Sequence, residues 1–401
     1  MGPAMAAETA TALKARRMAA GKKAAETKAR MKREAIATAK AHHPTRLPEL
    51  QPLQRARGCL VGGAVGDALG GPVEFLSLAA IRSRFGPQGV TKFEEAYGQV
   101  GAITDDTQMT FFTAEGLIRA IVRGRERGLS NFEGVTYYAY LRWLHTQGVP
   151  WDRIPQCSGE LDGWLVGEKL LHHRRAPGTT CLSSLAGPMG ELYQKLNNSK
   201  GCGGVMRAAP VGLIARSYGS AFHTGCQIAA ITHGHPSGFL AAGYLAMLIA
   251  ELMDGARLQD ALDRTDAVLS QWREYEEVAE AVRRARRAAG SQRPTPENVE
   301  RLGEGWVAEE ALAIAIFCSL TADDFRSGVL AAVNHGGDSD STGAITGNIL
   351  GALWGYEAIP ADLAQQVEAR EIAETLARDL LELSAGNDRV QPRQIERYPG
   401  W

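Results

Sequence analysis

Cysteine is sparse in this sequence, and its placement excludes several kinds of site. None of the six cysteines forms a CxxC pair, the spacing that zinc sites and redox-active dithiols commonly use. They are scattered over the 401 residues, at Cys59, Cys157, Cys181, Cys202, Cys226 and Cys318. In so long a chain this spacing indicates free thiols in a reducing compartment rather than a disulfide framework. We therefore expect a cytoplasmic protein.

Long apolar runs are also lacking. No uninterrupted run approaches the roughly 20 residues that span a bilayer. The nearest, GCLVGGAVGDALGG, is short and contains Asp67, and the N-terminus lacks the apolar core of a secretory signal peptide. With 45% hydrophobic and 22% charged residues, the composition is that of an ordinary globular protein. We expect no association with a membrane.

Alternating runs of β-branched residues are almost absent, which argues against a β-sheet protein. Apolar residues instead recur at helical spacing in 108–123, 133–146, 237–254, 259–288, 306–320 and 371–386. Two further segments, 59–71 and 343–355, are rich in small residues. Helices with Gly and Ala on one face can approach closely, so we expect these two at the centre. The sequence predicts one all-α domain over residues 48–401.

A net charge of −1 conceals an uneven distribution. Residues 1–40 contain ten Lys/Arg and three Glu, a charge of +7, which leaves −8 for the remainder. This stretch has few large apolar residues, so it can form a helix by propensity but cannot bury much surface. We expect residues 1–47 to be a basic extension that is a solvated tail, a partner-binding arm or a nucleic-acid contact. The acidic body and the lack of aromatic residues in 1–40 make nucleic acid an unfavoured partner.

The segment TDDT, residues 104–107, places two aspartates between two threonines where an apolar helical pattern begins. Asp and Thr are frequent at helix starts because their oxygens accept hydrogen bonds from unpaired backbone N–H groups. One cap does not account for two adjacent aspartates. Neighbouring side chains on a helix diverge by about 100°, so Asp105 and Asp106 would serve different partners, such as two ions. A cap with added surface charge is the alternative.

A second cluster, GGDSDST at 336–342, also precedes a small and apolar run. On a regular helix Asp338 and Asp340 would point to nearly opposite sides, but in an irregular turn before a helix both can converge. Ser341 would add a hydroxyl, and the preceding glycines permit a tight backbone. A capped, solvated turn is the alternative for this cluster too.

Together the two clusters offer four carboxylates and several hydroxyls, without paired His or Cys ligands. Such hard oxygen donors favour Mg²⁺, Mn²⁺ or Ca²⁺ over zinc, and the spacing is not that of a calcium-binding helix–loop–helix. Four acids brought together without cations would repel one another strongly. A dinuclear magnesium site would remove this repulsion.

Three more segments carry candidate residues, each with a plainer alternative. In GCLVGGAVGDALGGPVEF, Asp67 is either functional or a buried structural hydrogen bonder, and Glu74 follows a Gly-Gly-Pro break. In SKGCGGVMRAAPVGL, residues 199–213, the glycines would expose backbone N–H groups to phosphates, with Lys200 and Arg207 adding charge, or form an ordinary turn. In THGHPSG the histidines suit a loop and helix cap with ligand contact.

Taken together and in this order, the stretches GCLVGGAVGDALGGPVEF, TDDTQMT, GCGGVMRAAPVGL, THGHPSG and GGDSDSTGAITGNILGALWG resemble the ADP-ribosylglycohydrolase family, which includes dinitrogenase reductase-activating glycohydrolase. They span residues 58–355, nearly the whole body, and the pairing of TDDT with GGDSDSTG is specific. The basic extension lies outside the resemblance.

The resemblance implies an all-α fold with two Mg²⁺ (or Mn²⁺) ions at the mouth of a cleft. The ligands it implies are Thr104, Asp105, Asp106, Asp338, Asp340 and Ser341, the last of which stands where the family often has Thr. The residues it places near the substrate are Asp67, Glu74, Gly201, Cys202, Gly203, Gly204 and His233. Among these, Glu74 would lie near the metals and the ribose, the glycine turn near the diphosphate, and His233 near the nucleotide.

The implied activity is hydrolysis of a glycosidic bond at ribose C1″, removing ADP-ribose from a modified protein. Arginine-linked ADP-ribose is the expected substrate, with serine, other O-linked and nucleic-acid linkages as alternatives. This chemistry needs an activated water and a proton acceptor. Asp106 or Asp340 is the expected base, and Glu74 is a further catalytic candidate. A different interpretation is an immunity or inhibitor protein whose basic extension binds an ADP-ribosyltransferase toxin, with or without hydrolysis.

Overall fold

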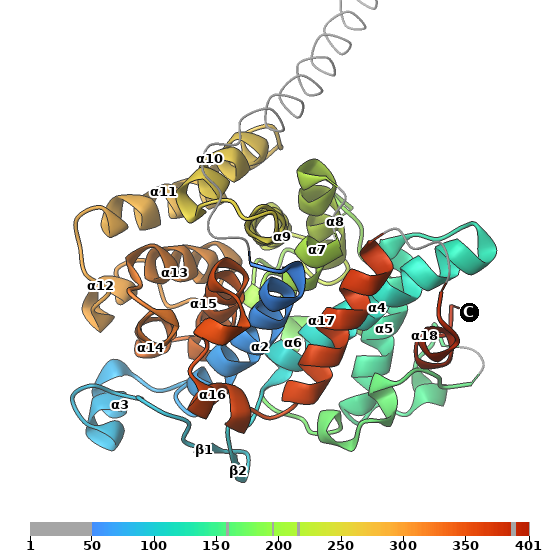
Figure 1. The fold of residues 1–401 in the computed structure, drawn as a ribbon, viewed down its shortest axis with the longest axis horizontal. Helices are drawn as coiled ribbons and strands as arrows, with labels where there is room; N and C mark the ends of the chain where they lie inside the picture. The colour runs from blue at the N-terminus through green and yellow to red at the C-terminus, as the bar shows by residue number, and fades with distance from the viewer. Residues whose placement is uncertain (1–49, 158–159, 195, 215–216, 386–389, 401) are drawn as a thin grey trace, which may run out of the picture. The chain divides into compact units, whose positions relative to one another are not determined.

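The computed structural model describes residues 50–157, 160–194, 196–214, 217–385 and 390–400, and helices dominate this part of the chain (Figure 1). The α-helices are α2 Pro52–Gly70, α3 Leu78–Phe85, α4 Asp105–Arg127, α5 Phe132–Thr146, α6 Thr179–Leu185, α7 Ala209–Ile214, α8 Tyr218–Ala230, α9 Pro236–Met253, α10 Leu258–Leu269, α11 Glu276–Ala289, α12 Pro296–Glu300, α13 Ala308–Thr321, α14 Phe325–Val333, α15 Ser339–Trp354, α16 Ala361–Gln366, α17 Arg370–Ser384 and α18 Pro392–Arg397. Short 3₁₀ helices are η1 Trp151–Arg153, η2 Leu165–Gly167, η3 Lys169–Leu171, η4 Cys202–Gly204 and η5 Tyr356–Ala358. The described strands are β1 Glu95–Ala96 and β2 Gln99–Val100, an antiparallel pair. The prediction of an all-α fold is confirmed.

One helical segment differs from its prediction. The apolar periodicity of 259–288 predicts a continuous helix, but the structure divides it into α10 and α11. The chain turns between them, and Glu274 adopts the left-handed conformation with φ 57°. The turn lets the Trp272 ring pack on Phe222 of α8, with ring centroids 5.2 Å apart. A contact with another helix therefore decides this break, which the local pattern does not reveal.

Helices α2 and α15 lie side by side, antiparallel and almost in backbone contact, at the centre of the described body (Figure 1). A Cβ atom added to Gly66 would lie 1.9 Å from the carbonyl oxygen of Gly343. One added to Gly347 would lie 1.9 Å from the carbonyl oxygen of Gly62. The small-residue pattern of the two segments thus serves the close packing that the sequence predicts, because no larger residue fits at these crossings.

Two polar side chains fix the register of this helix pair. The buried Arg55 guanidinium donates hydrogen bonds to the carbonyl oxygens of Ala352 and Leu353, at 2.8 and 2.7 Å. The Asn348 amide donates to the carbonyl oxygen of Cys59 at 2.8 Å. The Arg55 bonds satisfy carbonyls at the end of α15. The other end of α15, its aspartate-rich start, lies beside the end of α2, where a Cβ added to Gly70 would lie 2.3 Å from the Ser339 carbonyl oxygen.

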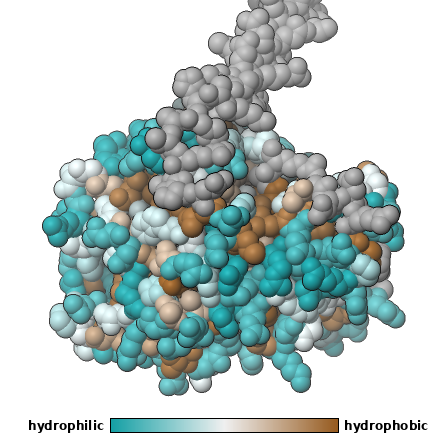
Figure 2. Space-filling model, in the orientation of Figure 1, coloured by the Kyte–Doolittle hydropathy of each residue, from teal (hydrophilic) through white to brown (hydrophobic). Residues whose placement is uncertain are grey.

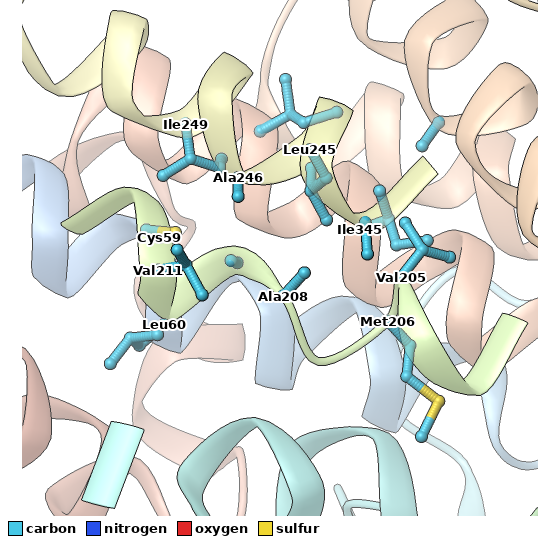
Figure 3. Packing of buried hydrophobic residues seen from close by; sticks show 14 of the residues in the cluster. Cys59, Leu60, Val205, Met206, Ala208, Val211, Leu245, Ala246, Ile249 and Ile345 are labelled. Carbon is cyan, nitrogen blue, oxygen red and sulfur yellow. The ribbon is translucent and has the colours of Figure 1, made fainter. Parts of the chain in front are cut away.

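Helix α9 is the described helix that is long and apolar enough to cross a membrane, and 94% of it is buried within the protein. Figure 3 shows its residues Leu245, Ala246 and Ile249 above Val205 and Val211, with Cys59 of α2 next to Val211 and Leu60 below. The face in Figure 2 is mostly hydrophilic, with smaller hydrophobic groups between. The apolar surface of α9 therefore belongs to the core.

The helix crossing gives a direct test of stability. We expect Gly66→Ala to lower the free energy of unfolding by about 3 kcal/mol, because the added methyl group meets backbone atoms and the helices must separate. The matched control is Gly124→Ala in α4, where the nearest atom to an added Cβ is 3.6 Å away. The control should be neutral or stabilising by up to about 1 kcal/mol. Urea unfolding measures the stability of both variants. An equal change for Gly66→Ala and Gly124→Ala would contradict the close packing of α2 on α15.

Candidate active site

A cavity of about 450 Å³ opens where all five sequence segments meet. It is lined by Glu74, Phe75, Asp105, Asp106, Ala176, Pro177, Gly178, Thr179, Thr180, Cys181, Gly201, Cys202, Gly203, Met206, His233, Trp306, Asp338, Asp340 and Ser341. The segment after α2 supplies Glu74, the first turns of α4 and α15 supply the aspartates, and the turn around η4 supplies Gly201–Gly203. A fifth segment, between α8 and α9, supplies His233. The structure therefore gathers most of the predicted site residues around one cavity.

Three of the predicted residues, Asp67, Thr104 and Gly204, do not line this cavity. Asp67 on α2 is fully buried, and its carboxylate accepts hydrogen bonds from the N–H groups of Thr104 and Thr107, at 3.0 and 3.2 Å. It also accepts from the Thr107 hydroxyl. Asp67 therefore fixes the start of α4 against α2. This is the structural alternative for Asp67, while its contact with substrate stays a prediction.

The first turn of α4 points two acids into the cavity. The Thr104 hydroxyl caps the helix by accepting from the Asp106 N–H at 3.2 Å. Asp105 accepts from the Gly178 N–H at 3.2 Å, whereas Asp106 Oδ1 is buried without a hydrogen-bond partner. Capping thus explains a threonine at position 104. A buried oxygen without a partner, such as Asp106 Oδ1, is expected to bind a hydrogen-bond donor or a cation.

The start of α15 brings Asp338 and Asp340 to the same cavity. Asp338 is the N-cap, outside regular helical geometry, and Asp340 is in the first turn. Both carboxylates accept from the Ser341 N–H, at 3.3 and 3.0 Å. The irregular turn therefore allows two acids, two positions apart, to converge as the sequence predicts.

Four acids of the cavity have raised pKa values and no basic residue beside them in the described lining. Burial, followed by the neighbouring charges of Asp340, Asp338 and Asp105, raises the pKa of Glu74 to about 11. Burial, followed by the charge of Asp340, also raises the pKa of Asp105, Asp106 and Asp338 well above the usual range. Among the described lining residues none is Lys or Arg. The five acids therefore lack a positive partner from the cavity wall.

The residues present fit hard divalent cations by their donor chemistry. The cavity offers carboxylate oxygens and the Ser341 hydroxyl, and oxygen atoms of Asp106 and Glu74 are buried without partners. Such donors suit Mg²⁺ or Mn²⁺. In the described part of the chain, no three His, Cys, Asp or Glu side chains are already arranged around one point that would hold an ion. The fit therefore rests on the donor set and on the uncompensated charge.

The basic residues near the glycine turn do not reach the cavity. Arg207 is fully buried, donates to the Thr232 hydroxyl at 2.6 Å and lies over the Tyr140 ring. Lys200 pairs with Glu277 and Glu309. Neither lines the cavity, so the charge that they would add for a phosphate stays a prediction.

His233 is buried beneath the cavity and shares a hydrogen bond of 2.8 Å with the Thr232 hydroxyl through Nδ1. Burial, with the nearby Arg207 charge, lowers the pKa of His233 to about 3. The imidazole is therefore neutral at physiological pH. His235 instead caps α9, where its ring accepts from the Ser237 N–H at 3.1 Å.

Several lining residues were missed from the sequence. The turn Ala176–Cys181 enters the site because Arg175 donates to the Ile103 carbonyl at 2.8 Å and pairs with Glu368. Phe75 and Trp306 also line the cavity. The Cys202 thiol donates to Asp338 at 2.7 Å. The Pro-Gly pair at 177–178 was a signal for a turn, but no local pattern placed it beside Asp105.

Comparison with known proteins agrees with the all-α fold. The family model of the ADP-ribosylglycohydrolases matches residues 48–390. An uncharacterized protein of Archaeoglobus fulgidus is 30% identical over 341 residues, covering 82% of this chain and 97% of the relative. ADP-ribosylarginine hydrolase Tri1 of Serratia proteamaculans is 25% identical over 367 residues, covering 86% and 84%. A solved ADP-ribosylglycohydrolase-related protein complex contains a similar chain, with a TM-score of 0.56, 27% identity and coverage of 83% and 99%.

The family model and the hydrolases among its relatives identify the protein as a glycohydrolase. The chain belongs to the ADP-ribosylglycohydrolase family, which confirms the resemblance seen in the sequence. The basic extension, residues 1–47, lies outside the described residues. Its separation from the domain over 48–401 and its binding to a toxin stay predictions, as does the cytoplasmic location.

Asp106 provides a test of the uncompensated charge. Its raised pKa in the folded state means that the protonated form favours folding below the unfolded pKa of about 4, and that this contribution is lost as pH rises. In protein freed of metal, Asp106→Asn should therefore gain stability relative to wild type between about pH 5 and pH 8. Urea unfolding at both pH values measures the difference. Asp323→Asn, at an exposed position, should show no such trend, and a difference independent of pH for Asp106→Asn would contradict the repulsion.

Proposed function

We propose that this protein is a Mg²⁺-dependent hydrolase that removes ADP-ribose from modified arginine side chains of proteins. The observation that carries the proposal is the cavity whose five buried carboxylates lack a basic partner among the described lining residues. The similarity to ADP-ribosylarginine hydrolase Tri1 supports the linkage to arginine.

Each of the two helix starts would supply part of the metal ligands. Asp105 and Asp106 with Thr104 would hold Mg²⁺ from the α4 side, and Asp338 and Asp340 with Ser341 from the α15 side. Two ions would offset the repulsion among the acids, and Mn²⁺ has the same preference for oxygen donors. When bound, such ions stabilise negative charge and lower the pKa of a coordinated water.

The reacting bond joins ribose C1″ to the arginine nitrogen, and its cleavage develops oxocarbenium character. A carboxylate is needed to accept the proton of the attacking water. Asp106 or Asp340 would be this base, and both line the cavity. Glu74 also faces the cavity, with one carboxyl oxygen unpartnered, and would hold the ribose or move a proton.

Other lining groups would hold the rest of ADP-ribose. Gly201, Cys202 and Gly203 form one wall without bulky side chains, which lets a diphosphate approach the backbone. The neutral His233 would offer the nucleotide a hydrogen bond without a charge. The cavity would thus bind the anionic part of the substrate through backbone and neutral groups, and its ribose through acids and metal.

A panel of substrates tests the activity. We expect release of ADP-ribose from arginine-linked substrate with Mg²⁺, loss of release after chelation, and slower release from serine-linked and nucleic-acid-linked substrates. Asp340→Ala should lower kcat at least 100-fold, because it removes a metal ligand or base. Chromatography of released ADP-ribose measures the rates.

The control for this panel is Asp323→Ala, an exposed aspartate at which we expect wild-type rates. Circular dichroism shows whether each variant keeps its helices. Failure of the folded wild type to release ADP-ribose from arginine, or full activity after chelation, would disprove the proposal.

Glu74→Gln separates proton transfer from binding. Glutamine keeps the size of the side chain and can still form hydrogen bonds, but it cannot take up or release a carboxyl proton. We expect kcat to fall about 100-fold with a smaller change in KM. Steady-state kinetics on arginine-linked substrate measure both constants. Glu95→Gln, at an exposed position in β1, should leave both unchanged, and an unaltered kcat for Glu74→Gln would exclude a role in proton transfer.

A further inference from the structure

Two aromatic rings stack on each other at the edge of the acidic cavity. The ring centroids of Phe75 and Trp306 lie 5.5 Å apart, and their planes are inclined by 20°. Both residues line the cavity, yet Phe75 is 69% and Trp306 37% exposed. Large apolar side chains usually bury more of their surface. The pair thus offers ring surface to the cavity and to solvent rather than to the core.

The backbone holds Phe75 in a conformation that aromatic residues rarely adopt. Phe75 has a φ of 65°, in the left-handed region, and directly follows the cavity residue Glu74. The turn is fixed on both sides, by hydrogen bonds from the Glu74 N–H to Gly70 at 3.0 Å and from the Leu76 N–H to Val73 at 2.9 Å. Such a conformation is unfavourable for a bulky residue and is a reason to look for a function.

Trp306 is positioned by hydrogen bonds to two walls of the site. Its carbonyl accepts from the Cys202 N–H at 3.1 Å, and the Ala308 N–H donates to the Lys200 carbonyl at 2.8 Å. The carbonyl of Glu304, two residues before Trp306, accepts a hydrogen bond from the Asp338 N–H at 2.8 Å. The loop before α13 is therefore tied to both the glycine turn and the start of α15, which fixes where the indole can lie.

The chemistry of this edge favours a planar cation. Aromatic faces carry partial negative charge and attract cations, and a guanidinium also stacks on them as a flat group. Carboxylates line the cavity behind the rings, and the described lining contains no Lys or Arg that would repel a cation. An arginine-linked substrate presents a guanidinium directly beside ribose C1″, whereas a serine linkage presents a neutral oxygen.

We propose that the Phe75–Trp306 pair binds the guanidinium of the modified arginine and so selects arginine-linked over serine-linked ADP-ribose. This inference rests on the proposed hydrolase function and assigns its substrate preference to two residues. The rings recognise the leaving group, whereas the acids act on the ribose. Removing a ring therefore weakens use of one substrate and leaves the other nearly unchanged.

The experiment compares Phe75→Ala, Trp306→Ala and the double variant on both substrates. We expect kcat/KM for arginine-linked ADP-ribose to fall about tenfold for each single variant, within the range of cation–π contacts, and further for the double variant. For serine-linked substrate it should change less than about threefold. Trp306→Phe keeps a ring face and should recover most of the activity. Tyr138→Ala, which removes an exposed ring away from this cavity, is the control.

The affinity for free ADP-ribose tests whether the rings instead contact the adenine or the ribose. Isothermal titration calorimetry should give the same Kd for wild type and both variants, because the product lacks the guanidinium. If Phe75→Ala and Trp306→Ala weaken ADP-ribose binding and slow both substrates equally, the rings contact the adenine or ribose, and the inference is wrong.

A second measurement separates this inference from the proposed function. Agmatine carries a guanidinium without ADP-ribose, and its binding beside Trp306 should change tryptophan fluorescence in wild type but not in Trp306→Phe. If wild type cleaves no arginine-linked substrate yet shows this change, the hydrolase proposal fails and guanidinium binding stands. If it cleaves that substrate with unchanged kcat/KM in the double variant, the aromatic inference alone fails.

Discussion

The near-contact of the α2 and α15 backbones is the constraint on which the rest of the site depends. Glycines at the crossings remove the side chains that would separate the two helices, and Arg55 and Asn348 fix their register. Asp67 then extends this arrangement from α2 to the start of α4. The two acidic helix starts are thus held by one helix, through packing on one side and through hydrogen bonds on the other.

This rigid arrangement explains how the protein tolerates an unfavourable concentration of acids. Burial and mutual repulsion raise the pKa of Glu74 and of three aspartates, so the carboxylates do not stabilise the fold by themselves. The tightly packed core supplies that stability instead. If the cavity binds cations as we propose, this rigid packing would hold the acids in place before the ions arrive, which is the preorganisation that metal-assisted catalysis needs.

The sequence predicted those features of the site that depend on residues close together in the chain. Small residues in 59–71 and 343–355 predicted the close helices. The aspartates at two helix starts predicted that acids gather at one site, because one cap cannot use two aspartates. Contacts between distant segments stayed hidden. The break near Trp272, the turn beside Asp105 and the placement of Trp306 each depend on a partner far along the chain. Asp67 fits its structural alternative, since its bonds to α4 are visible only in three dimensions.

The pairing of α2 with α15 also determines when the acids meet as the chain folds. Arg55 and its acceptor Leu353 are 298 positions apart, so this contact closes almost the entire body. Contacts between such distant positions are slow to form because a long loop must be ordered first. We therefore expect the aspartates of α4 and α15 to come together only when the two ends of the body pair. Their mutual repulsion would then act only in a state in which the packing that overcomes it also forms.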